Sequence, residues 1–526
     1  MSVNAGDSGG KSAGGFFGQP WGLSTLFMTE MWERFSYYGI RPLLILFMTT
    51  ALLSGGFGFD RPQASAIVGI YAASVYLASL PGGWIADRLL GLRRAIQYGA
   101  VLITLGHLSI GLTSHIGGKT PFFVGLILIV LGTGLLKPNI SAIVGDLYPE
   151  GGARRDAGFA VFYMGINLGA TAGQIFTGLL GEKVGFGWGF GVAGVGMLLG
   201  LIWYTVSARR TLGNIGVEPS RDPDPAVQAK RESVTKMVVG IGFAIIVLVI
   251  VLAAMGTIEI DPQAVASYMT YILVGIALVY FAYVFIAGKL NSDERKRILV
   301  IAVLFVAAAV FWAAFEQAPT SLNLFAKDFT DRQWGSFEVP SLWYQSINSF
   351  FIIIFAPVFA AIWTWLGKRN IDFSSPARFA LGLALAGIGF WIMVVPANSL
   401  VATQGAIKVS GLWLAASYLF QTFGELLVSP VGLSSMTKLS PRRFVGQMMG
   451  IWFLATSVGN LIAGIVGGSV DPEKLEQTPE LFTWTTIALF ASAVVLALLA
   501  IPISRMMRNV DDEKFDQVEA AGPSIE

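Results

Sequence analysis

Four charged and two aromatic residues share one face of a single apolar stretch near the start of the chain. They are Glu30, Glu33, Arg34, Tyr37, Tyr38 and Arg41. At ~100° per residue of helix, all six fall within an arc of roughly 140°. An ionisable group at the centre of a bilayer costs a few kcal/mol or more unless it is paired or faces a hydrated cavity. The pattern therefore predicts a membrane helix whose charged face is turned away from lipid, toward an ion-paired or wet site.

Three more ionisable residues lie inside apolar stretches, namely Lys137, Glu316 and Glu425. The three buried cations lie in the first half of the chain together with Glu30 and Glu33, whereas the second half holds only Glu316 and Glu425. A ligand with a carboxylate at one end and an ammonium at the other would fit across such a field. A simple anion or a simple cation would use only half of it.

Uncharged polar residues also fall in or at the ends of apolar stretches. They are Tyr38, Tyr76, Asn139, Asn167, Gln317, Asn348 and Ser429. Their amides and hydroxyls could bind the N–H and C=O groups of a peptide, although interhelical hydrogen bonding suits the asparagines equally well. Trp312 and Trp452 could line pockets for variable side chains, but packing is the commoner role of aromatic residues. We expect His107, mid-way along its stretch, to be a hydrogen-bonded structural histidine.

Composition places the chain in the membrane. Of its 526 residues, 54% are hydrophobic and only 13% are charged, too few charges to coat a soluble globule of this size. The net charge of +2 predicts no nucleic-acid partner, and without cysteine or a His/Asp/Glu cluster we expect no metal site, no cofactor and no catalytic residues. With two histidines in the chain, proton chemistry near neutral pH has to rest mainly on carboxylates.

Apolar stretches of about 20 residues or more predict fourteen membrane spans between residues 22 and 504. One of them is 298–325, which Pro319 interrupts. If the N-terminus is cytoplasmic, 25 of the 35 Lys and Arg residues lie inside, seven lie outside and three lie within spans. This asymmetry supports the span map and predicts that both termini are cytoplasmic.

The spans divide into two groups of six, separated by two helices almost free of charge. The expected fold is therefore an all-α polytopic membrane protein with two six-helix bundles and an inserted helix pair, fourteen transmembrane helices in total. Such repeats are typical of transporters with a site between the halves. The predicted segments are a disordered cytoplasmic tail (1–20), an N-terminal bundle (21–208), a cytoplasmic linker (209–236), the inserted pair (237–290), a C-terminal bundle (291–506) and a cytoplasmic tail (507–526).

Six motifs follow one another along the chain. They are EMWERFSYYG at 30–39, GWIADRLLGLRR at 83–94, GTGLLKPN at 132–139, FYMGINLG at 162–169, FWAAFEQ at 311–317 and GELLVSPVG at 424–432. Together they resemble the proton-dependent oligopeptide transporters of the major facilitator superfamily over residues 20–505. The inserted helix pair is similar to that of bacterial members. The resemblance implies a major facilitator fold and proton-coupled import of di- and tripeptides across the cell (inner) membrane, by a monomer.

The resemblance also implies a set of substrate-binding residues. They are Arg34, Tyr38, Tyr76, Lys137, Asn167, Trp312, Asn348, Glu425, Ser429 and Trp452. Of these, Arg34 and Lys137 with Tyr38 would hold the peptide carboxylate. Glu425, with the two asparagines Asn167 and Asn348, would hold the amino terminus.

Proton coupling is assigned to a second, overlapping set. It comprises Glu30, Glu33, Arg34, Arg41, Lys137 and Glu316. Glu316 would pair with Arg41 as a proton-responsive gate, and Glu30 and Glu33 would act through Arg34 and Lys137. Some relatives carry a histidine in the second span, but residues 62–87 contain none, so coupling should run through the carboxylates.

Other functions fit the same sequence. The alternative on this fold is a proton-coupled transporter of another small solute such as nitrate, a drug or a peptide-like compound, although the acids Glu316 and Glu425 disfavour an inorganic anion. A membrane enzyme would need catalytic groups that the spans lack, and a channel or receptor would not need alternating access.

Overall fold

A computed structural model describes residues 15–150, 152–369 and 373–520. Fourteen α-helices of 22 residues or more run through this part of the chain, as the sequence predicts. They are α1 (Trp21–Thr49), α2 (Arg61–Ile85), α3 (Leu92–Ile116), α4 (Thr120–Asp146), α5 (Gly152–Lys183), α6 (Phe186–Thr211), α7 (Pro225–Ala254), α8 (Pro262–Ala287), α9 (Ser292–Phe315), α11 (Leu342–Lys368), α12 (Ser375–Ala402), α13 (Leu412–Leu439), α14 (Val445–Val466) and α15 (Gln477–Ala520).

Short elements join the long helices. They are α10 (Asn323–Asp328), the one-turn helices η1 (Leu52–Ser54), η2 (Ala86–Leu90), η3 (Ala318–Leu322), η4 (Arg442–Phe444) and η5 (Gly467–Ser469), and the strands β1 (Thr330–Asp331), β2 (Gln333–Trp334), β3 (Phe337–Glu338) and β4 (Val409–Ser410). Strand β1 pairs with β4 in parallel, and β2 pairs with β3 antiparallel. The strands are two residues each, so the fold is essentially all-α.

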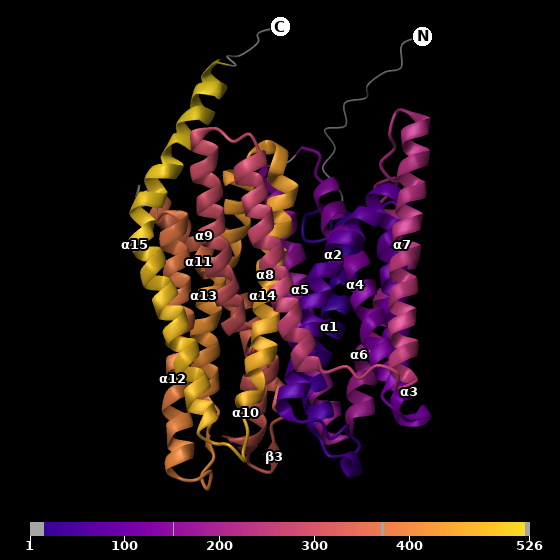
Figure 1. Ribbon diagram of the computed structural model, residues 1–526, viewed down its shortest axis with the longest axis vertical. Coiled ribbons are helices and arrows are strands. Elements are labelled where there is room, and N and C mark those ends of the chain that lie inside the picture. The colour runs from indigo at the N-terminus through magenta and orange to yellow at the C-terminus, as the bar shows by residue number, and fades with distance from the viewer. Residues whose placement is uncertain (1–14, 151, 370–372, 521–526) are drawn as a thin grey trace.

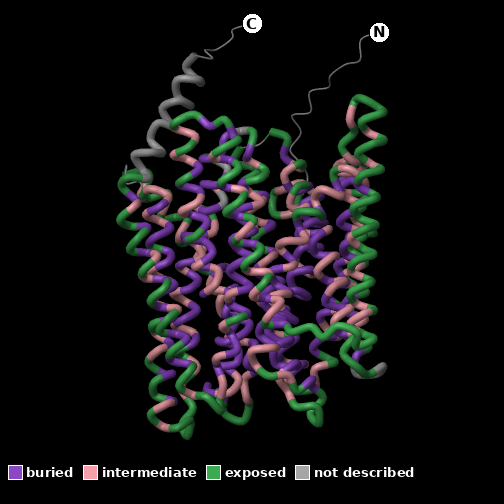
Figure 2. The backbone as a smooth tube through the Cα atoms, in the orientation of Figure 1, coloured by how far each residue is buried: buried purple, intermediate pink, exposed green. Residues whose placement is uncertain are grey.

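Twelve helical segments are long and apolar enough to cross a membrane among the described residues. Helices α1 and α13 complete the fourteen, and α1 is the helix that carries the four charges. Exposed residues run along the outer helices and are most continuous on α7 (Figure 2). Many of them are large and apolar, and Thr235 is the one buried residue of α7. A soluble monomer rarely exposes so large an apolar surface, so this surface is suited to lipid. The prediction of an all-α polytopic membrane protein is confirmed.

Two bundles lie side by side (Figure 1). Helices α1–α6 form one, in which α1 packs on α5 and α6, and α3 packs on α4 and α6. Helices α9 and α11–α15 form the other, in which α12 packs on α13 and α15. The bundles meet where α2 packs on α14 and α5 on α11. Helix α8 packs on α2 and α14 along this seam, whereas α7 lies at the outer edge beside α4.

The described chain begins and ends at the same end of the bundles, here called the terminal end; the opposite end is the distal end (Figure 1). Missing side chains allow the bundles to approach closely. A Cβ on Gly69 of α2 would lie 2.7 Å from Gly464 Cα of α14. Within the second bundle, a Cβ on Gly459 of α14 would lie 2.5 Å from Trp312 Cβ of α9. Both positions require glycine because the neighbouring helix already occupies that space.

Regular backbone structure extends into three of the predicted linker and tail segments. Helix α7 begins at Pro225, inside the predicted linker, because Asp224 caps it by accepting from Ala226 N at 2.8 Å and proline suits the first helical turn. In the predicted disordered tail, Phe16 and Gln19 exchange two backbone hydrogen bonds of 3.0 and 3.1 Å, while residues 1–14 lie outside the described residues. Helix α15 continues to Ala520 through most of the predicted C-terminal tail, whose residues 521–526 also lie outside.

Candidate functional site

A polar cavity of about 110 Å³ lies between the two bundles. Eight of the predicted site residues line it: Tyr38, Arg41, Tyr76, Asn167, Trp312, Glu316, Asn348 and Glu425. They come from α1, α2 and α5 on one side and from α9, α11 and α13 on the other. Ligand pockets usually measure ~300 Å³ or more, so the cavity in this structure is smaller than most sites that hold a small molecule.

Arg34 does not line the cavity; it is enclosed in an ion-paired cluster on α1. Its Nε lies 2.7 Å from Glu30 Oε1 and 2.9 Å from Glu33 Oε2, and its side chain is 3% exposed. The hydroxyl of Thr133 on α4 donates to Glu33 Oε1 at 3.2 Å. The predicted partners of Arg34 are thus in contact with it. The guanidinium of Arg34 can bind a ligand only if its ion pair with Glu30 or Glu33 breaks.

Lys137 lies behind the wall of the cavity rather than in it. Its ammonium sits 4.0 Å from the ring centroid of Tyr76, a cation–π contact with a lining residue. Tyr37 lies between two cations in the same way, with Arg34 and Arg41 at 5.6 and 5.3 Å from its ring. The first bundle therefore presents Tyr38 and Tyr76 to the cavity and keeps Lys137 directly behind Tyr76, whereas Arg34 lies against Tyr37, which does not line the cavity.

The opposite wall is acidic and amide-rich. Asn348 Nδ2 on α11 donates to Thr422 Oγ1 at 2.9 Å and to Glu425 Oε2 at 3.3 Å on α13. Across the cavity, Asn167 Nδ2 donates to Tyr163 O at 3.0 Å, which leaves its carbonyl oxygen for other partners. An ammonium placed here could therefore bind a carboxylate and neutral acceptors together.

Arg41 and Glu316 form the predicted ion pair across the bundle interface. Arg41 Nη2 also donates to Asn460 Oδ1 on α14 at 3.3 Å, so this guanidinium joins α1 to two elements of the other bundle. Both ion-paired side chains are at least nine-tenths buried. The contact is buried and charge-assisted, so it depends on both side chains being charged.

Glu316 owes its position to a break in the helix. The predicted span 298–325 is divided: α9 ends at Phe315, and a single π-turn, η3, follows at Ala318. Pro319 lacks the N–H that would bond back to Phe315, and a proline disrupts the preceding turn. Such irregular backbone at membrane depth is tolerated where it lines a cavity, and it marks binding sites in transporters.

Two predicted site residues lie elsewhere. Ser429 follows Glu425 by one turn, so it lies ~6 Å further toward the terminal end on nearly the same face, beyond the residues that line the cavity. Trp452 packs its indole over Gly432 of α13 and is 6% exposed. Both were predicted to bind substrate, and neither lines the cavity of this structure.

His107 is buried, but its predicted role was wrong in one respect. Neither ring nitrogen has a hydrogen-bond partner among the described residues. A Cβ on Gly194 of α6 would lie 3.0 Å from His107 Cβ, so α6 approaches α3 closely at this point. The residue is a packing element between α3 and α6.

Twelve further residues line the cavity and were not predicted, and four of them share a simple spacing with predicted residues: Tyr163, Gln345, Tyr418 and Gln421. Each precedes a predicted residue by three, four or seven positions on the same helix. Residues with this spacing share a helix face. Helical spacing from Asn167, Asn348 and Glu425 is therefore the signal that could have found them.

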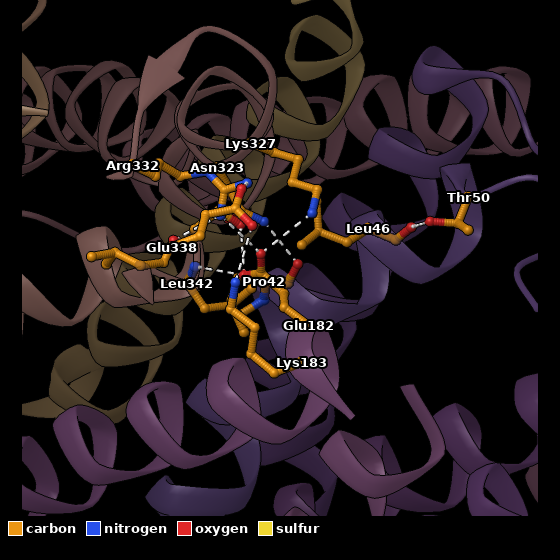
Figure 3. Close-up of polar contacts among 12 residues, drawn as sticks. Pro42, Leu46, Thr50, Glu182, Lys183, Asn323, Lys327, Arg332, Glu338 and Leu342 are labelled. Carbon is orange, nitrogen blue, oxygen red and sulfur yellow. Dashed lines mark hydrogen bonds and ion pairs between the residues drawn. The ribbon is translucent and has the colours of Figure 1, made fainter. Parts of the chain in front are cut away.

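At the distal end the bundles are joined by a second charged cluster (Figure 3). Glu182, at the end of α5, accepts hydrogen bonds from Ser341 Oγ at 2.9 Å and from Leu342 N at 3.3 Å. It also pairs with Arg332 at 3.3 Å and Lys327 at 3.4 Å. Its side chain is only 4% exposed. One buried carboxylate of the first bundle thus holds several donors of the second.

Two neighbouring pairs reinforce this closure. Arg61 Nη1 lies 2.7 Å from Asp328 Oδ2 and donates to Val470 O at 2.6 Å. Lys183 Nζ donates to Glu338 Oε2 at 3.0 Å, and this hydrogen bond holds the pKa of Glu338 below its ordinary value of 4.5. A wider cavity of about 1290 Å³ opens beside this cluster and contains no predicted site residue. The structure is therefore closed at the distal end, below the polar cavity.

Two helical bundles that enclose a polar cavity at mid-depth, with a charged closure at one end, define a membrane transporter of the major facilitator type. The chain belongs to the POT family, the proton-dependent oligopeptide transporters, whose family model matches residues 93–481. It is 48% identical to the peptide transporter YePEPT of Yersinia enterocolitica, with 98% of this chain and all of the relative covered.

Two further comparisons agree. A di-/tripeptide transporter of Lactococcus lactis subsp. cremoris is 39% identical over 94% of this chain and 98% of the relative. The crystal structure of a POT peptide transporter in complex with sulfate is 41% identical, with a TM-score of 0.85 over 94% of this chain and 97% of that one. The family and its relatives are transporters and not enzymes.

Proposed function

We propose that this protein is a proton-coupled symporter that imports di- and tripeptides by alternating access. The observation that carries the proposal is the polarity of the central cavity. Glu425 with Asn348 lies on one side. Tyr38 and Tyr76 lie on the other, with Lys137 directly behind Tyr76 and Arg34 against the neighbouring Tyr37. A dipeptide carries opposite charges at its two ends and so complements both sides at once.

In this proposal the two ends of the peptide have separate receptors. Glu425 binds the amino terminus, with Asn348 and Asn167 as neutral acceptors. The carboxylate recruits Arg34 and Lys137 from behind the tyrosines. Because Arg34 is held by Glu30 and Glu33, protonation of one of these acids releases the guanidinium to the carboxylate. Proton uptake and peptide binding are thereby coupled.

Glu316 is the proposed gate. When the distal end is open, Glu316 takes a proton and no longer holds Arg41. Peptide bound between the bundles neutralises their opposed charges, which favours closure of the distal end. Hydration from the terminal end then removes the proton, the Arg41–Glu316 pair re-forms, and peptide leaves. The structure, with this pair formed and the distal end closed, corresponds to the end of that cycle.

The proton gradient supplies enough energy for accumulation. One proton moving down 100 mV contributes ~2.3 kcal/mol. At ~1.4 kcal/mol per decade, this supports roughly 50-fold accumulation per proton. We further propose that the terminal end faces the cytoplasm at the inner membrane, because the Lys and Arg residues are concentrated at that end. A monomer suffices, since one chain provides every lining residue.

A competition assay tests the substrate. Purified protein in liposomes takes up labelled dialanine, and unlabelled dialanine, N-acetyl-dialanine or nitrate is added as competitor. We expect dialanine to compete best and nitrate not to compete. Removing a charge-assisted hydrogen bond costs ~1.5–3 kcal/mol. The Glu425→Gln variant should therefore bind dialanine roughly 10- to 100-fold more weakly, whereas its affinity for the acetylated peptide should fall far less.

The matched control is Glu480→Gln, which makes the same change at an exposed acid in the first turn of α15. It should leave both competitors unchanged. Equal losses for free and acetylated peptide in Glu425→Gln would remove Glu425 from the amino-terminal site. Competition by nitrate as strong as that by dialanine would favour the alternative, a transporter of another small solute on this fold.

A further inference from the structure

A third cavity lies at the terminal end of the first bundle, apart from the central cavity. It measures about 360 Å³ and lies between the start of α3, the end of α6 and the segment that follows α6. Three arginines line it, Arg93 and Arg94 from α3 and Arg209 from α6. None of the lining residues is acidic. The cavity is therefore a concentrated positive site, with room for roughly ten waters at ~30 Å³ each.

The arginines are positioned by the fold but not neutralised by it. Arg93 Nη1 donates to Gly213 O at 2.7 Å, and its own carbonyl accepts from the hydroxyl of Tyr204 at 3.2 Å, which fixes the floor of the cavity. In the described part of the chain, Arg94 and Arg209 have no carboxylate partner. Two guanidinium groups thus remain free for an anion, and guanidinium groups bind phosphate in bidentate geometry.

Each free arginine ends a stripe of exposed apolar side chains. On α3, Arg94 is followed by Tyr98, Val101, Leu105 and Leu108, all at least 38% exposed. Their spacing of three and four residues places them on one helix face, which runs ~21 Å along α3. This length is comparable to the hydrocarbon depth of one leaflet, ~15 Å, plus its interfacial region.

Helix α6 repeats the arrangement in the opposite chain direction. Counting back from Arg209, the residues Val206, Ile202 and Leu198 are at least 42% exposed and share one face. Both stripes therefore lie on the lipid-facing surface, and each ends at an arginine that lines the same cavity. A molecule with a phosphate at one end and long apolar chains at the other matches this layout along its whole length.

We propose that this cavity binds a phosphate group, supplied by the headgroup of an anionic phospholipid whose acyl chains lie along α3 and α6. Basic pockets between helices at the cytoplasmic side attract anionic headgroups, and each basic residue near the surface contributes about 1 kcal/mol. The site stands apart from peptide transport: it involves none of the residues assigned to substrate or proton, and it would exist in a protein with another cargo.

The test compares lipid with free anion. Native mass spectrometry of the detergent-purified full-length protein records retention of phosphatidylglycerol, phosphatidylcholine or inorganic phosphate, each titrated at fixed ionic strength. Arg94→Gln with Arg209→Gln removes both free guanidinium groups. Each guanidinium contributes about 1 kcal/mol, so the loss of both should weaken the binding of phosphatidylglycerol about 30-fold.

The control removes two charges at the same end without touching the cavity. Arg210→Gln with Arg221→Gln alters exposed arginines that do not line it, and Arg221 pairs with Glu218 at 3.3 Å. This variant should bind phosphatidylglycerol like the wild type. A photoreactive phosphatidylglycerol should crosslink to the stretches 93–108 and 198–209 of the wild type, and a merely diffuse charge effect would not localise it there.

Two outcomes support the phosphate site and assign its source. Retention of phosphatidylglycerol but not phosphate assigns the lipid, and comparable binding of inorganic phosphate assigns the free anion. Two outcomes overturn the proposal: equal retention of phosphatidylglycerol and phosphatidylcholine by the wild type, or an equal loss of phosphatidylglycerol in the two double variants. Since all four substituted side chains are exposed, the variants should fold, and their unligated melting temperatures verify this.

Discussion

Glu182 should control how readily the protein opens at its distal end. Its carboxylate, on the first bundle, accepts from Ser341 Oγ and Leu342 N and pairs with Arg332 and Lys327, all on the second bundle (Figure 3). All of these contacts have to break when the bundles separate at this end. Replacing Glu182 with glutamine keeps the size of the side chain and one acceptor oxygen but removes the charge.

The contacts themselves set the magnitude. Breaking a buried ion pair costs ~3–5 kcal/mol when the partner is left unpaired. Here Arg332 keeps Glu338 at 2.5 Å and Val339 O at 2.7 Å, so the full penalty does not apply. Lys327 is 41% exposed, and its contribution is largely screened. What is lost is mainly the charge assistance of the bonds from Ser341 and Leu342, about 2 kcal/mol together.

A change of that size shifts the balance between distal-closed and distal-open forms about 30-fold toward the open form. The chain has no cysteine, so a single cysteine introduced at Ala170, which lines the central cavity, reports its accessibility without background. The assay is the rate of labelling by an impermeant maleimide added from the distal side of oriented vesicles. The Glu182→Gln variant should be labelled up to about 30-fold faster.

The control is Glu473→Gln, an exposed acid at the same end. It should be labelled at the wild-type rate. If Glu182→Gln were also labelled at the wild-type rate, the carboxylate would contribute nothing to closure, and the reasoning from its buried contacts would be refuted. Equal acceleration in both variants would point instead to general surface charge.

Three other predictions concern single residues. Glu316→Gln should uncouple uptake from the pH gradient while leaving peptide exchange between equal solutions intact, measured by counterflow in liposomes. Gly432→Ala should lower stability by ~1–3 kcal/mol, seen as a lower melting temperature, because the added methyl overlaps the indole of Trp452. Lys183 lowers the pKa of Glu338, so the ionised Glu338 carboxylate stabilises the folded protein above pH 4.5, and this stabilisation is lost as the pH falls through the lowered value. The difference in melting temperature between wild type and Glu338→Gln should therefore shrink between pH 7 and pH 3.

Each of these has its own control or counter-result. Fully proton-driven uptake by Glu316→Gln would remove that residue from the gate. Gly446→Ala in α14, where an added Cβ meets no atom within 4 Å, should melt at or slightly above the wild-type temperature. A loss as large as that of Gly432→Ala would show that the overlap is not the cause. A melting difference for Glu338→Gln that is the same at pH 7 and pH 3 would rule out the Lys183 contact as its origin.

The sequence predicted the helices and the charged face of α1 well, because both depend on local patterns. Apolar length alone gives the fourteen helices, and a period of 3.6 residues gives the shared face of Glu30, Arg34 and Arg41. The pair between Arg41 and Glu316 followed from the resemblance. The hydrogen bond from Arg41 to Asn460 could not be predicted, because it depends on how α14 is rotated against α1.

The same limit explains why some predicted site residues do not line the cavity of this structure. Periodicity fixes which face Ser429 shares with Glu425, but not how far along α13 the cavity extends. Arg34 was expected to face the substrate, yet the structure encloses it between two acids. The role of Glu182 in closing the distal end could not be predicted, because its partners lie some 145 to 160 positions later in the chain. Contacts between bundles are a property of packing, and no local pattern encodes them.

In the proposed mechanism, the cavity between the bundles carries dipeptides together with protons. The most direct measurement is uptake of labelled dialanine into liposomes that contain the purified protein, with and without an inward pH gradient. With the gradient, dialanine should accumulate above the external concentration, and this accumulation should collapse on addition of a protonophore. Equilibration to the external concentration, unaffected by the gradient or the protonophore, would contradict it.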